Sequence, residues 1–146
     1  MSAGTVVAVC ISDVKGVIKK PVPEISVKIG HGIAGDAHAA DWHRQISLLA
    51  DESVDKMRDK IPGLSAGVFA ENILTRGLCL YELPVGTKLR IGKTLLEVTQ
   101  IGKICHNAEC AVKKQTGDCV MPREGIFTVV IEEGVIKPGD EITVEN

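Results

Sequence analysis

The feature that most constrains the fold is a series of short β-type segments separated by turns. The clearest is a hairpin, in which residues 87–91 alternate in polarity, Gly92-Lys93 turn and residues 94–101 return. A continuous apolar run at 5–11 is typical of a strand buried on both faces or lining a barrel, and residues 125–131 read as another strand. The chain is therefore predicted to be mainly β and barrel-like.

The other segments also support a mainly β, barrel-like fold. Residues 45–49 read as a short strand, and 135–144 as two strands around a Pro138-Gly139 turn. Residues 17–29, with Pro21 and Pro23, read as an edge strand or a structured excursion. One helix is predicted from Asp51, as N-cap, through residue 60, with a Glu52–Lys56 pair. Because one helix offers one crossover, the sheet should be largely antiparallel.

The length and composition of the chain limit the classes of protein to which it can belong. A chain of 146 residues suits one domain with one core, spanning 1–146. A net charge of -2 and only one Trp, one Tyr and two Phe argue against a nucleic-acid partner. The sequence shows no signal-peptide pattern and no apolar run long enough to span a membrane, so a soluble, cytoplasmic protein without membrane contact is expected.

Reactive and charged side chains are most concentrated between the predicted strands that end at residue 101 and begin at residue 126. Three of the five cysteines, Cys105, Cys110 and Cys119, fall here among polar residues and the cations Lys103 and Arg123. The other two, Cys10 and Cys79, stand in apolar surroundings and are predicted to be packing residues.

Four interpretations of the three clustered cysteines remain open. One thiol is a nucleophile or sulfur carrier activated by nearby cations, or it ligates a transition metal. Alternatively, Cys105, Cys110, Cys119 and a histidine hold structural zinc, although the C-x4-C-x8-C spacing lacks a second close pair. In the last interpretation all three are ordinary surface or packing thiols.

A second polar cluster spans residues 30–44, with three histidines, two aspartates and several glycines. It offers proton-transfer groups and ligands, but a tight turn at Gly35-Asp36 with locally bonded histidines explains it equally well. Glu71 and Asn72 sit between apolar residues, where adjacent strand positions face opposite sides. They are either satisfied buried polar groups or pocket contacts.

The order of several motifs resembles the MOSC domain, named for the C-terminal domain of molybdenum cofactor sulfurases. The matching segments follow one another along essentially the whole chain: Gly35-Asp36-Ala37-His38-Ala39, residues 44–49, 67–73, 85–92 and 96–105, and a closing 134–140. The resemblance is to the stand-alone bacterial type, and it implies a β-rich, barrel-like fold.

The resemblance also implies site residues. Cys105 matches the family's characteristic cysteine, which carries sulfur or ligates molybdenum, so it is the predicted metal ligand. Cys119 and Cys110 are additional candidate catalytic thiols, able to resolve a persulfide as a disulfide. Arg123 is a candidate contact for the cofactor's phosphate. Further candidate cofactor-binding residues are His38, Asp36, Glu71, Asn72 and Lys103.

The leading hypothesis is a protein that binds molybdenum cofactor (molybdopterin) or carries sulfur for its metabolism. Proteins of cofactor biosynthesis or cysteine desulfurases would then be partners. One alternative is a reductase of N-hydroxylated compounds, as in the related amidoxime-reducing proteins, which needs an external electron donor. The other is a non-catalytic adaptor that holds zinc. Whether the protein is an enzyme stays open.

Overall fold

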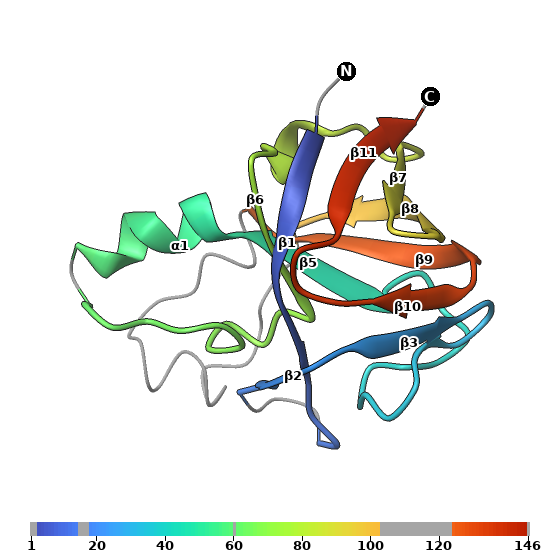
Figure 1. Ribbon diagram of the computed structural model, residues 1–146, viewed down its shortest axis with the longest axis horizontal. Coiled ribbons are helices and arrows are strands. Elements are labelled where there is room, and N and C mark those ends of the chain that lie inside the picture. Colours follow the sequence, from blue (N-terminus) through green and yellow to red (C-terminus); the bar gives the residue numbers. More distant parts are fainter. Residues whose placement is uncertain (1–2, 15–17, 60, 103–123, 146) are drawn as a thin grey trace.

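The computed structural model describes residues 3–14, 18–59, 61–102 and 124–145. Seven strands form a closed barrel in the order β11, β7, β8, β9, β5, β6, β1, and pairing of β11 with β1 closes it (Figure 1). The barrel strands are β1 (Ala3–Ile11), β5 (Ile46–Ala50), β6 (Ile73–Arg76), β7 (Lys88–Ile91), β8 (Thr94–Ile101), β9 (Ile126–Glu132) and β11 (Glu141–Glu145). The predicted barrel-like, mainly β fold is confirmed.

The barrel is largely antiparallel, as predicted. Among the described strands, only β5 and β6 pair in parallel, with Leu48 opposite Ile73. The crossover between them carries α1 (Asp51–Arg58), which stands on one side of the barrel in Figure 1. A parallel pair needs such a connection, and the predicted helix supplies it.

The edge-strand prediction for residues 17–29 is confirmed in part. Strand β2 (Lys20–Val22) pairs with the end of β1 and lies at the edge of the large sheet, with Pro21 opposite Cys10. Proline suits this position because an edge strand leaves N–H groups unpaired. The next segment, β3 (Ile25–Lys28), belongs to a different sheet.

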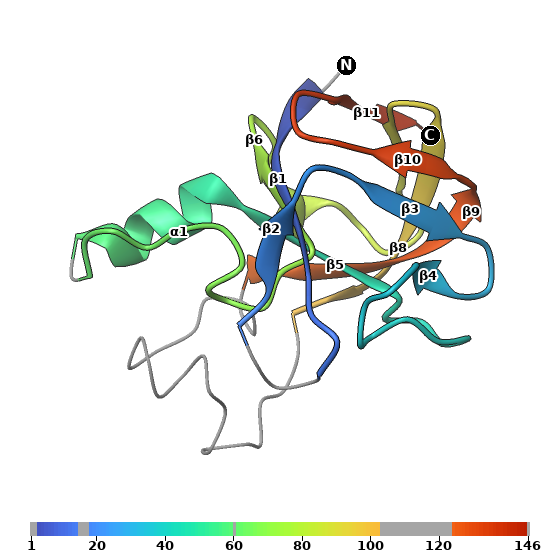
Figure 2. The ribbon, with the colours of Figure 1, turned by 60° about the horizontal axis from the view of Figure 1, so that its bottom comes forward.

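This second sheet has three short strands and covers part of the barrel. In it, β3 lies between β10 (Gly134–Ile136) and β4 (Gly32–Ile33), as Figure 2 shows. Val27, Ile33 and Ile136 are fully buried in the same apolar cluster as the barrel residues Leu89 and Leu96. The two sheets therefore share one main core.

The turn predicted at Pro138-Gly139 is also confirmed. The N–H of Asp140 donates to the carbonyl of Lys137 at 3.2 Å, and Gly139 has a φ of 94°. A type II turn requires positive φ at this position, which glycine adopts without steric cost. After the turn, β11 pairs with β7 and β1, whereas β10 pairs with β3.

Two details of the predicted helix are wrong. The N-cap is Ala50, with no side-chain capping bond, and Asp51 is the first helical residue. Asp51 instead forms ion pairs with Arg58 and Arg76, so its carboxylate faces guanidinium groups in place of backbone N–H groups. The helix also ends at Arg58, before the predicted boundary.

The predicted Glu52–Lys56 pair is replaced by contacts to other segments. Glu52 accepts a hydrogen bond from the N–H of Gly77 at 2.8 Å. Lys56 donates to both carboxylate oxygens of Glu124, at 3.0 and 2.8 Å. Both side chains thus connect α1 to neighbouring segments, which local spacing along a helix cannot predict.

Candidate functional site

The candidate site lies at one end of the barrel. Strand register aligns Val9, Ile73, Leu48, Ile126 and Ile101 across successive strands at this end. Beyond them the chain enters the connections 12–19, 34–45, 64–72 and 102–125. We call this end of the barrel, with the described residues of these connections, the barrel mouth. Two segments singled out from the sequence, 30–44 and the cysteine-containing connection, are therefore both anchored here.

A buried ion pair organises the barrel mouth. The ammonium of Lys19 lies 2.7 Å from Oδ1 of Asp36, and both side chains are fully shielded from solvent. Asp36 also accepts hydrogen bonds from the N–H groups of Ser12 and His38, both at 3.1 Å. These contacts tie the connection after β1 to the glycine-rich segment before β5.

The same contacts keep Asp36 ionised. Burial alone would raise the pKa of Asp36, but the hydrogen bond and charge of Lys19 oppose this effect. The N–H groups of Ser12 and His38 act in the same direction, so the pKa of Asp36 lies below its usual value. Because Lys19 neutralises the carboxylate, Asp36 is not a free base in this arrangement.

His38 completes the cluster and reaches the surface. Its Nδ1 atom lies 3.0 Å from the ammonium of Lys19, and its side chain is 28% exposed. An ammonium only donates, so Nδ1 accepts and the ring proton sits on Nε2. His38 is thereby joined to the Lys19–Asp36 pair through Nδ1.

Arg44 supplies the clearest sign of an absent partner. Its guanidinium carbon lies 4.6 Å from the ring centre of Trp42 and 5.6 Å from that of Phe127. Its Nε is buried and has no hydrogen-bond partner among the described residues. Trp42 in turn donates from Nε1 to the carbonyl of His38 at 2.8 Å, which joins Arg44 to the Lys19–Asp36–His38 cluster.

A buried guanidinium donor without an acceptor is costly in a folded protein. An anionic group such as phosphate would satisfy it, because guanidinium forms strong charge-assisted bonds to phosphate oxygens. The rings of Trp42 and Phe127 both lie within cation–π range of the Arg44 guanidinium. The described part of the barrel mouth is therefore suited to binding an anion.

Asn72 and Glu71 are satisfied buried groups that shape the barrel mouth. Asn72 accepts from the N–H of Ser47 at 3.0 Å and donates to the carbonyl of Cys10 at 3.1 Å. It therefore ties β5 to β1 from its place immediately before β6. Both residues are almost fully buried because the chain enters β6 only at Ile73, so the alternation expected of a strand does not apply.

Glu71 holds the loop before it. Its carboxylate accepts from the N–H groups of Gly67 and Phe69, at 2.8 and 3.2 Å. Burial raises the pKa of Glu71 to about 7, although these backbone hydrogen bonds act in the opposite direction. Glu71 thus stabilises the loop through backbone contacts, and no observation places it in contact with a ligand.

Cys10 and Cys79 lie among the described residues, and the prediction that each is a packing residue holds for Cys10 alone. Cys10 is fully buried, and burial with the nearby charge of Glu71 raises the pKa of its thiol to about 12. It is therefore a packing residue and a poor nucleophile. Cys79 was predicted to pack as well, but this prediction is wrong, since Cys79 is exposed immediately before the short 3-10 helix η1 (Leu80–Glu82).

The remaining predicted site residues lie outside the described residues: Lys103, Cys105, Cys110, Cys119 and Arg123. Within the described ranges, no group of three or more histidine, cysteine or acidic side chains is arranged to hold a metal ion. The described helices also include none long and apolar enough to cross a membrane.

Sequence reasoning missed Lys19 and Arg44. Nothing in the local sequence around Lys19 marks it as buried, since its partner Asp36 is 17 residues away. Arg44 carried a weak signal, an arginine next to the histidine-rich segment and directly before a strand. Both residues become recognisable only when the connections at the barrel mouth are brought together.

The described part of the chain is a closed β-barrel with a buried ion pair and an arginine at one end. The sequence profile of the MOSC domain matches residues 34–143. Because that match spans most of the chain, the protein belongs to the MOSC domain family. This family is associated with molybdenum cofactor binding and with sulfur-related functions. No curated protein matches the chain.

Solved structures show the same fold at low sequence identity. The YuaD protein from Bacillus subtilis is 19% identical, with a TM-score of 0.82 over 97% of this chain and 95% of its own. YiiM from Geobacillus stearothermophilus is 21% identical, with a TM-score of 0.74 over 98% and 75%. YiiM from Escherichia coli is 18% identical, with a TM-score of 0.68 over 100% and 70%.

Proposed function

We propose that this protein binds molybdenum cofactor, or a sulfur intermediate destined for it, at the barrel mouth, with Cys105 as the sulfur-bearing residue. The observation that carries the proposal is the buried Nε of Arg44, which has no hydrogen-bond partner among the described residues and lies beside the Lys19–Asp36–His38 cluster. It supports a ligand with an anionic group, and the phosphate of a pterin cofactor is such a group.

The chain's own residues have separate roles in this proposal. Arg44 binds the anionic group, held between Trp42 and Phe127. His38 borders the site, with its Nδ1 bonded to Lys19. The Lys19–Asp36 pair positions His38 without adding net charge. When bound, the cofactor would supply molybdenum redox and sulfur-ligand chemistry.

The proposed thiol belongs to the connection that starts and ends at the barrel mouth. The N–H of Gly102 donates to the carbonyl of Gly125 at 2.6 Å, so both ends of that connection are joined beside Ile101 and Ile126. Lys103 and Arg123 are the cations nearest in sequence to these ends. We include them as further contacts for the cofactor, and cofactor-biosynthesis proteins or a cysteine desulfurase as its suppliers.

The test compares variants in which one cysteine at a time is replaced by serine, each purified from a host that makes the cofactor. Molybdenum is measured by elemental analysis and pterin by fluorescence, for the wild type, Cys105→Ser, Cys110→Ser and Cys119→Ser. The wild type and the last two variants should retain molybdenum and pterin, whereas Cys105→Ser should lose the molybdenum. A wild type without cofactor but with a persulfide on Cys105 supports the sulfur-carrier form.

Two results contradict the proposal. Equal cofactor retention by Cys105→Ser assigns the role to another thiol. Zinc at one ion per chain with no pterin and no persulfide replaces the proposal with the zinc-holding adaptor.

A further inference from the structure

His43 lies next to Arg44 in the barrel mouth and is held in place by strand β8. Its Nε2 atom lies 2.9 Å from Oε1 of Gln100, and Nε2 of Gln100 donates to the carbonyl of Gly102 at 2.8 Å. The hydroxyl of Thr99 donates to the backbone carbonyl of His43. The His43 side chain is exposed, so its position is fixed while solutes can still reach it.

These hydrogen bonds determine which ring nitrogen of His43 is available. A carbonyl only accepts, so the amide nitrogen of Gln100 faces Gly102 and its amide oxygen faces His43. Nε2 of His43 must therefore donate, and in the neutral ring the proton sits on Nε2. Nδ1 then carries the lone pair, and no described residue forms a hydrogen bond with it. Nδ1 is the atom that takes up a proton when His43 becomes cationic.

His43 and Arg44 share their aromatic neighbours. The Arg44 guanidinium carbon lies 4.6 Å from the ring centre of Trp42, and the His43 ring packs edge-on against Trp42, with ring centres 6.0 Å apart. Gln100, which holds His43, pairs across the sheet with Phe127. The Phe127 ring centre lies 5.6 Å from the same guanidinium carbon. His43 and Arg44 therefore border the same part of the barrel mouth.

The described surroundings of His43 do not neutralise a positive charge on its ring. Thr99 and Gln100 contact it from β8, and both are uncharged. Among the described residues, no carboxylate forms an ion pair with His43. The charged residues nearest to it in sequence are Arg44 and the exposed Asp41. A protonated His43 thus adds a second positive charge beside Arg44.

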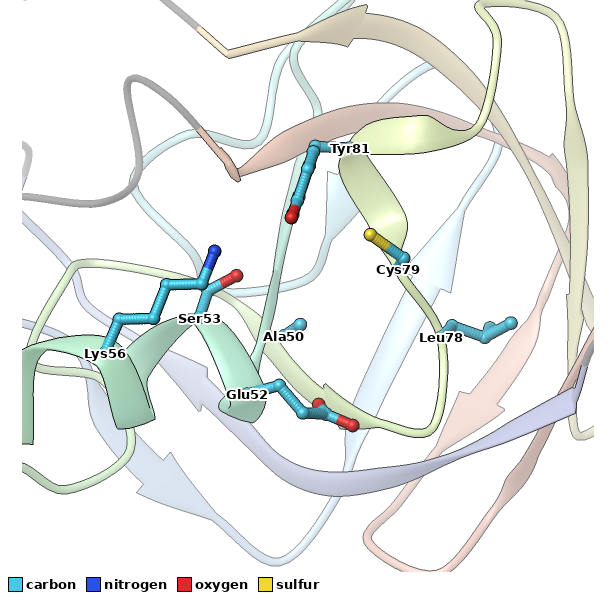
Figure 3. A pocket seen from close by; sticks show the side chains of 7 residues that line it. All are labelled: Ala50, Glu52, Ser53, Lys56, Leu78, Cys79 and Tyr81. Atoms are coloured by element: carbon cyan, nitrogen blue, oxygen red, sulfur yellow. The ribbon is translucent and has the colours of Figure 1, made fainter.

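A pocket elsewhere in the described structure is less suited to an anion. This pocket, of about 140 Å³, lies between α1 and η1, with Glu52, Lys56 and Tyr81 in its lining (Figure 3). The Lys56 ammonium already bonds both carboxylate oxygens of Glu124, at 3.0 and 2.8 Å. Glu52 adds a negative charge to the same lining. Arg44 and His43 of the barrel mouth are therefore the better anion contacts.

We infer that His43 is a second, proton-dependent contact for the anion that Arg44 binds, so the barrel mouth prefers a phosphate monoester to a phosphodiester. Histidine changes charge close to neutral pH, and a protonated His43 with Arg44 supplies two positive charges. A phosphate monoester carries up to two negative charges near neutral pH, whereas a diester carries one. If the ligand itself brings the proton, the neutral Nδ1 accepts it, and the same complex forms.

This inference rests on the barrel mouth as the anion site of the proposed function, but not on pterin, molybdenum or Cys105. The experiment uses Trp42, the only tryptophan of the chain, as a fluorescent reporter, because its ring contacts both His43 and Arg44. The intact protein is titrated with sulfate at pH 6, 7 and 8 and constant ionic strength, and calorimetry checks each Kd. Sulfate stays doubly charged throughout this range, so any pH dependence belongs to the protein.

The Kd for sulfate should rise about tenfold between pH 6 and pH 8, as His43 loses its proton and one charge-assisted hydrogen bond is lost. His43→Gln should weaken binding about tenfold at pH 6 and remove the pH dependence. Arg44→Gln should weaken binding at all three pH values. A His43→Gln protein with the wild-type pH dependence overturns the inference, and so does a wild type that does not bind sulfate at pH 6.

Two variants serve as controls for these changes. His31→Gln replaces an exposed histidine outside the barrel mouth, and Lys56→Gln removes the cation of the pocket in Figure 3. Both should bind sulfate as the wild type does at each pH. An equal loss of affinity in His31→Gln and His43→Gln overturns the assignment of His43 as a specific contact.

Methyl phosphate and dimethyl phosphate test the ligand class at pH 6.5. Methyl phosphate should bind the wild type about tenfold more tightly than dimethyl phosphate, and this preference should decrease in His43→Gln. Equal Kd values for the two esters overturn the inference. His43-dependent anion binding by a protein that retains no cofactor would support this inference and remove the proposed function. Cofactor retention with an anion affinity that ignores pH would do the reverse.

Discussion

The Lys19–Asp36 pair is the residue-scale feature on which the barrel mouth depends. Removing water from an ammonium and a carboxylate is costly, and their attraction offsets this only while both partners remain. The pair gains further bonds from Ser12 and His38, which satisfy the other carboxylate positions. Its loss should therefore affect both stability and the position of His38.

Replacing Asp36 alone should strongly destabilise the protein. Asp36→Asn leaves the Lys19 ammonium buried without a counter-charge, which should lower the free energy of unfolding by about 3–5 kcal/mol. Adding Lys19→Met removes that unpaired charge, so the double variant should be more stable than Asp36→Asn. Urea unfolding measures the free energy of unfolding of the single and the double variant. Additive losses in the double variant would show that the two residues do not act as a pair.

Glu71 should give stability an unusual dependence on pH. Its pKa is raised from the usual 4.5 to about 7, so in this window the folded protein keeps a proton that the unfolded chain releases. The contribution of Glu71 is complete below pH 4.5 and is lost as pH rises through about 7. The free energy of unfolding should fall by roughly 3 kcal/mol across the window.

The control for this prediction is the same substitution at a second, exposed glutamate. Glu71→Gln should abolish the decrease in unfolding free energy between pH 5 and 8, because glutamine does not titrate. Glu141→Gln, at an exposed position in β11, should keep it. A Glu71→Gln protein with the wild-type pH profile of urea unfolding would assign the dependence to other groups.

The sequence could identify some of these residues but not their roles. Asp36, His38, Glu71 and Asn72 stood out because polar side chains interrupted glycine-rich or apolar segments. Their partners are distant in sequence, since Asn72 bonds Ser47 and the carbonyl of Cys10, 25 and 62 residues away. Burial of Lys19 depends on two connections meeting, which no local pattern encodes.

At the scale of elements, the loop before β6 is the least tolerant of substitution. Gly67 has a φ of 88°, and a Cβ there would lie 2.0 Å from the carbonyl oxygen of Lys19. The carbonyl of Gly67 accepts from the N–H of Lys19 at 3.0 Å, so the two backbones cannot separate without breaking this bond. The loop therefore fixes the segment that carries the buried lysine.

The prediction compares two glycines of similar backbone conformation. Gly67→Ala should lower the free energy of unfolding by more than about 3 kcal/mol, because strain at positive φ adds to a backbone clash. Gly63→Ala, where φ is 85° and no atom lies within 4 Å of the new Cβ, should cost only about 1–2 kcal/mol. Similar losses in urea unfolding would rule out the close contact.

Helices and strands could be predicted where the sequence pattern that specifies them lies within the segment itself. The β7–β8 hairpin follows from alternation and a tight turn, and Leu89 pairs with Leu96 as that pattern requires. The cap of α1 was predicted wrongly because Asp51 has guanidinium partners from two places in the fold. The exposed position of Cys79 was missed because the apolar neighbours Leu78 and Leu80 are buried while the thiol between them is not.

At the scale of the whole molecule, closing the barrel creates the site. The pairing of β1 with β11 completes the ring of strands, and the ends of β1, β5, β6, β8 and β9 then meet at the barrel mouth. The fold class could be predicted from strand number and turns. The arrangement of Arg44, Trp42 and Phe127 could not, because it arises from segments that meet only in the closed barrel.

The most direct test of the account is the affinity of the barrel mouth for the isolated pterin cofactor, followed by fluorescence titration. Arg44→Gln should raise the Kd about tenfold or more, since it removes a charge-assisted bond to the anionic group. Arg90→Gln, which removes an arginine paired with Glu132 and Glu145, is the control and should bind as the wild type does. Equal Kd values for the wild type and Arg44→Gln would contradict the assignment of the barrel mouth as the binding site.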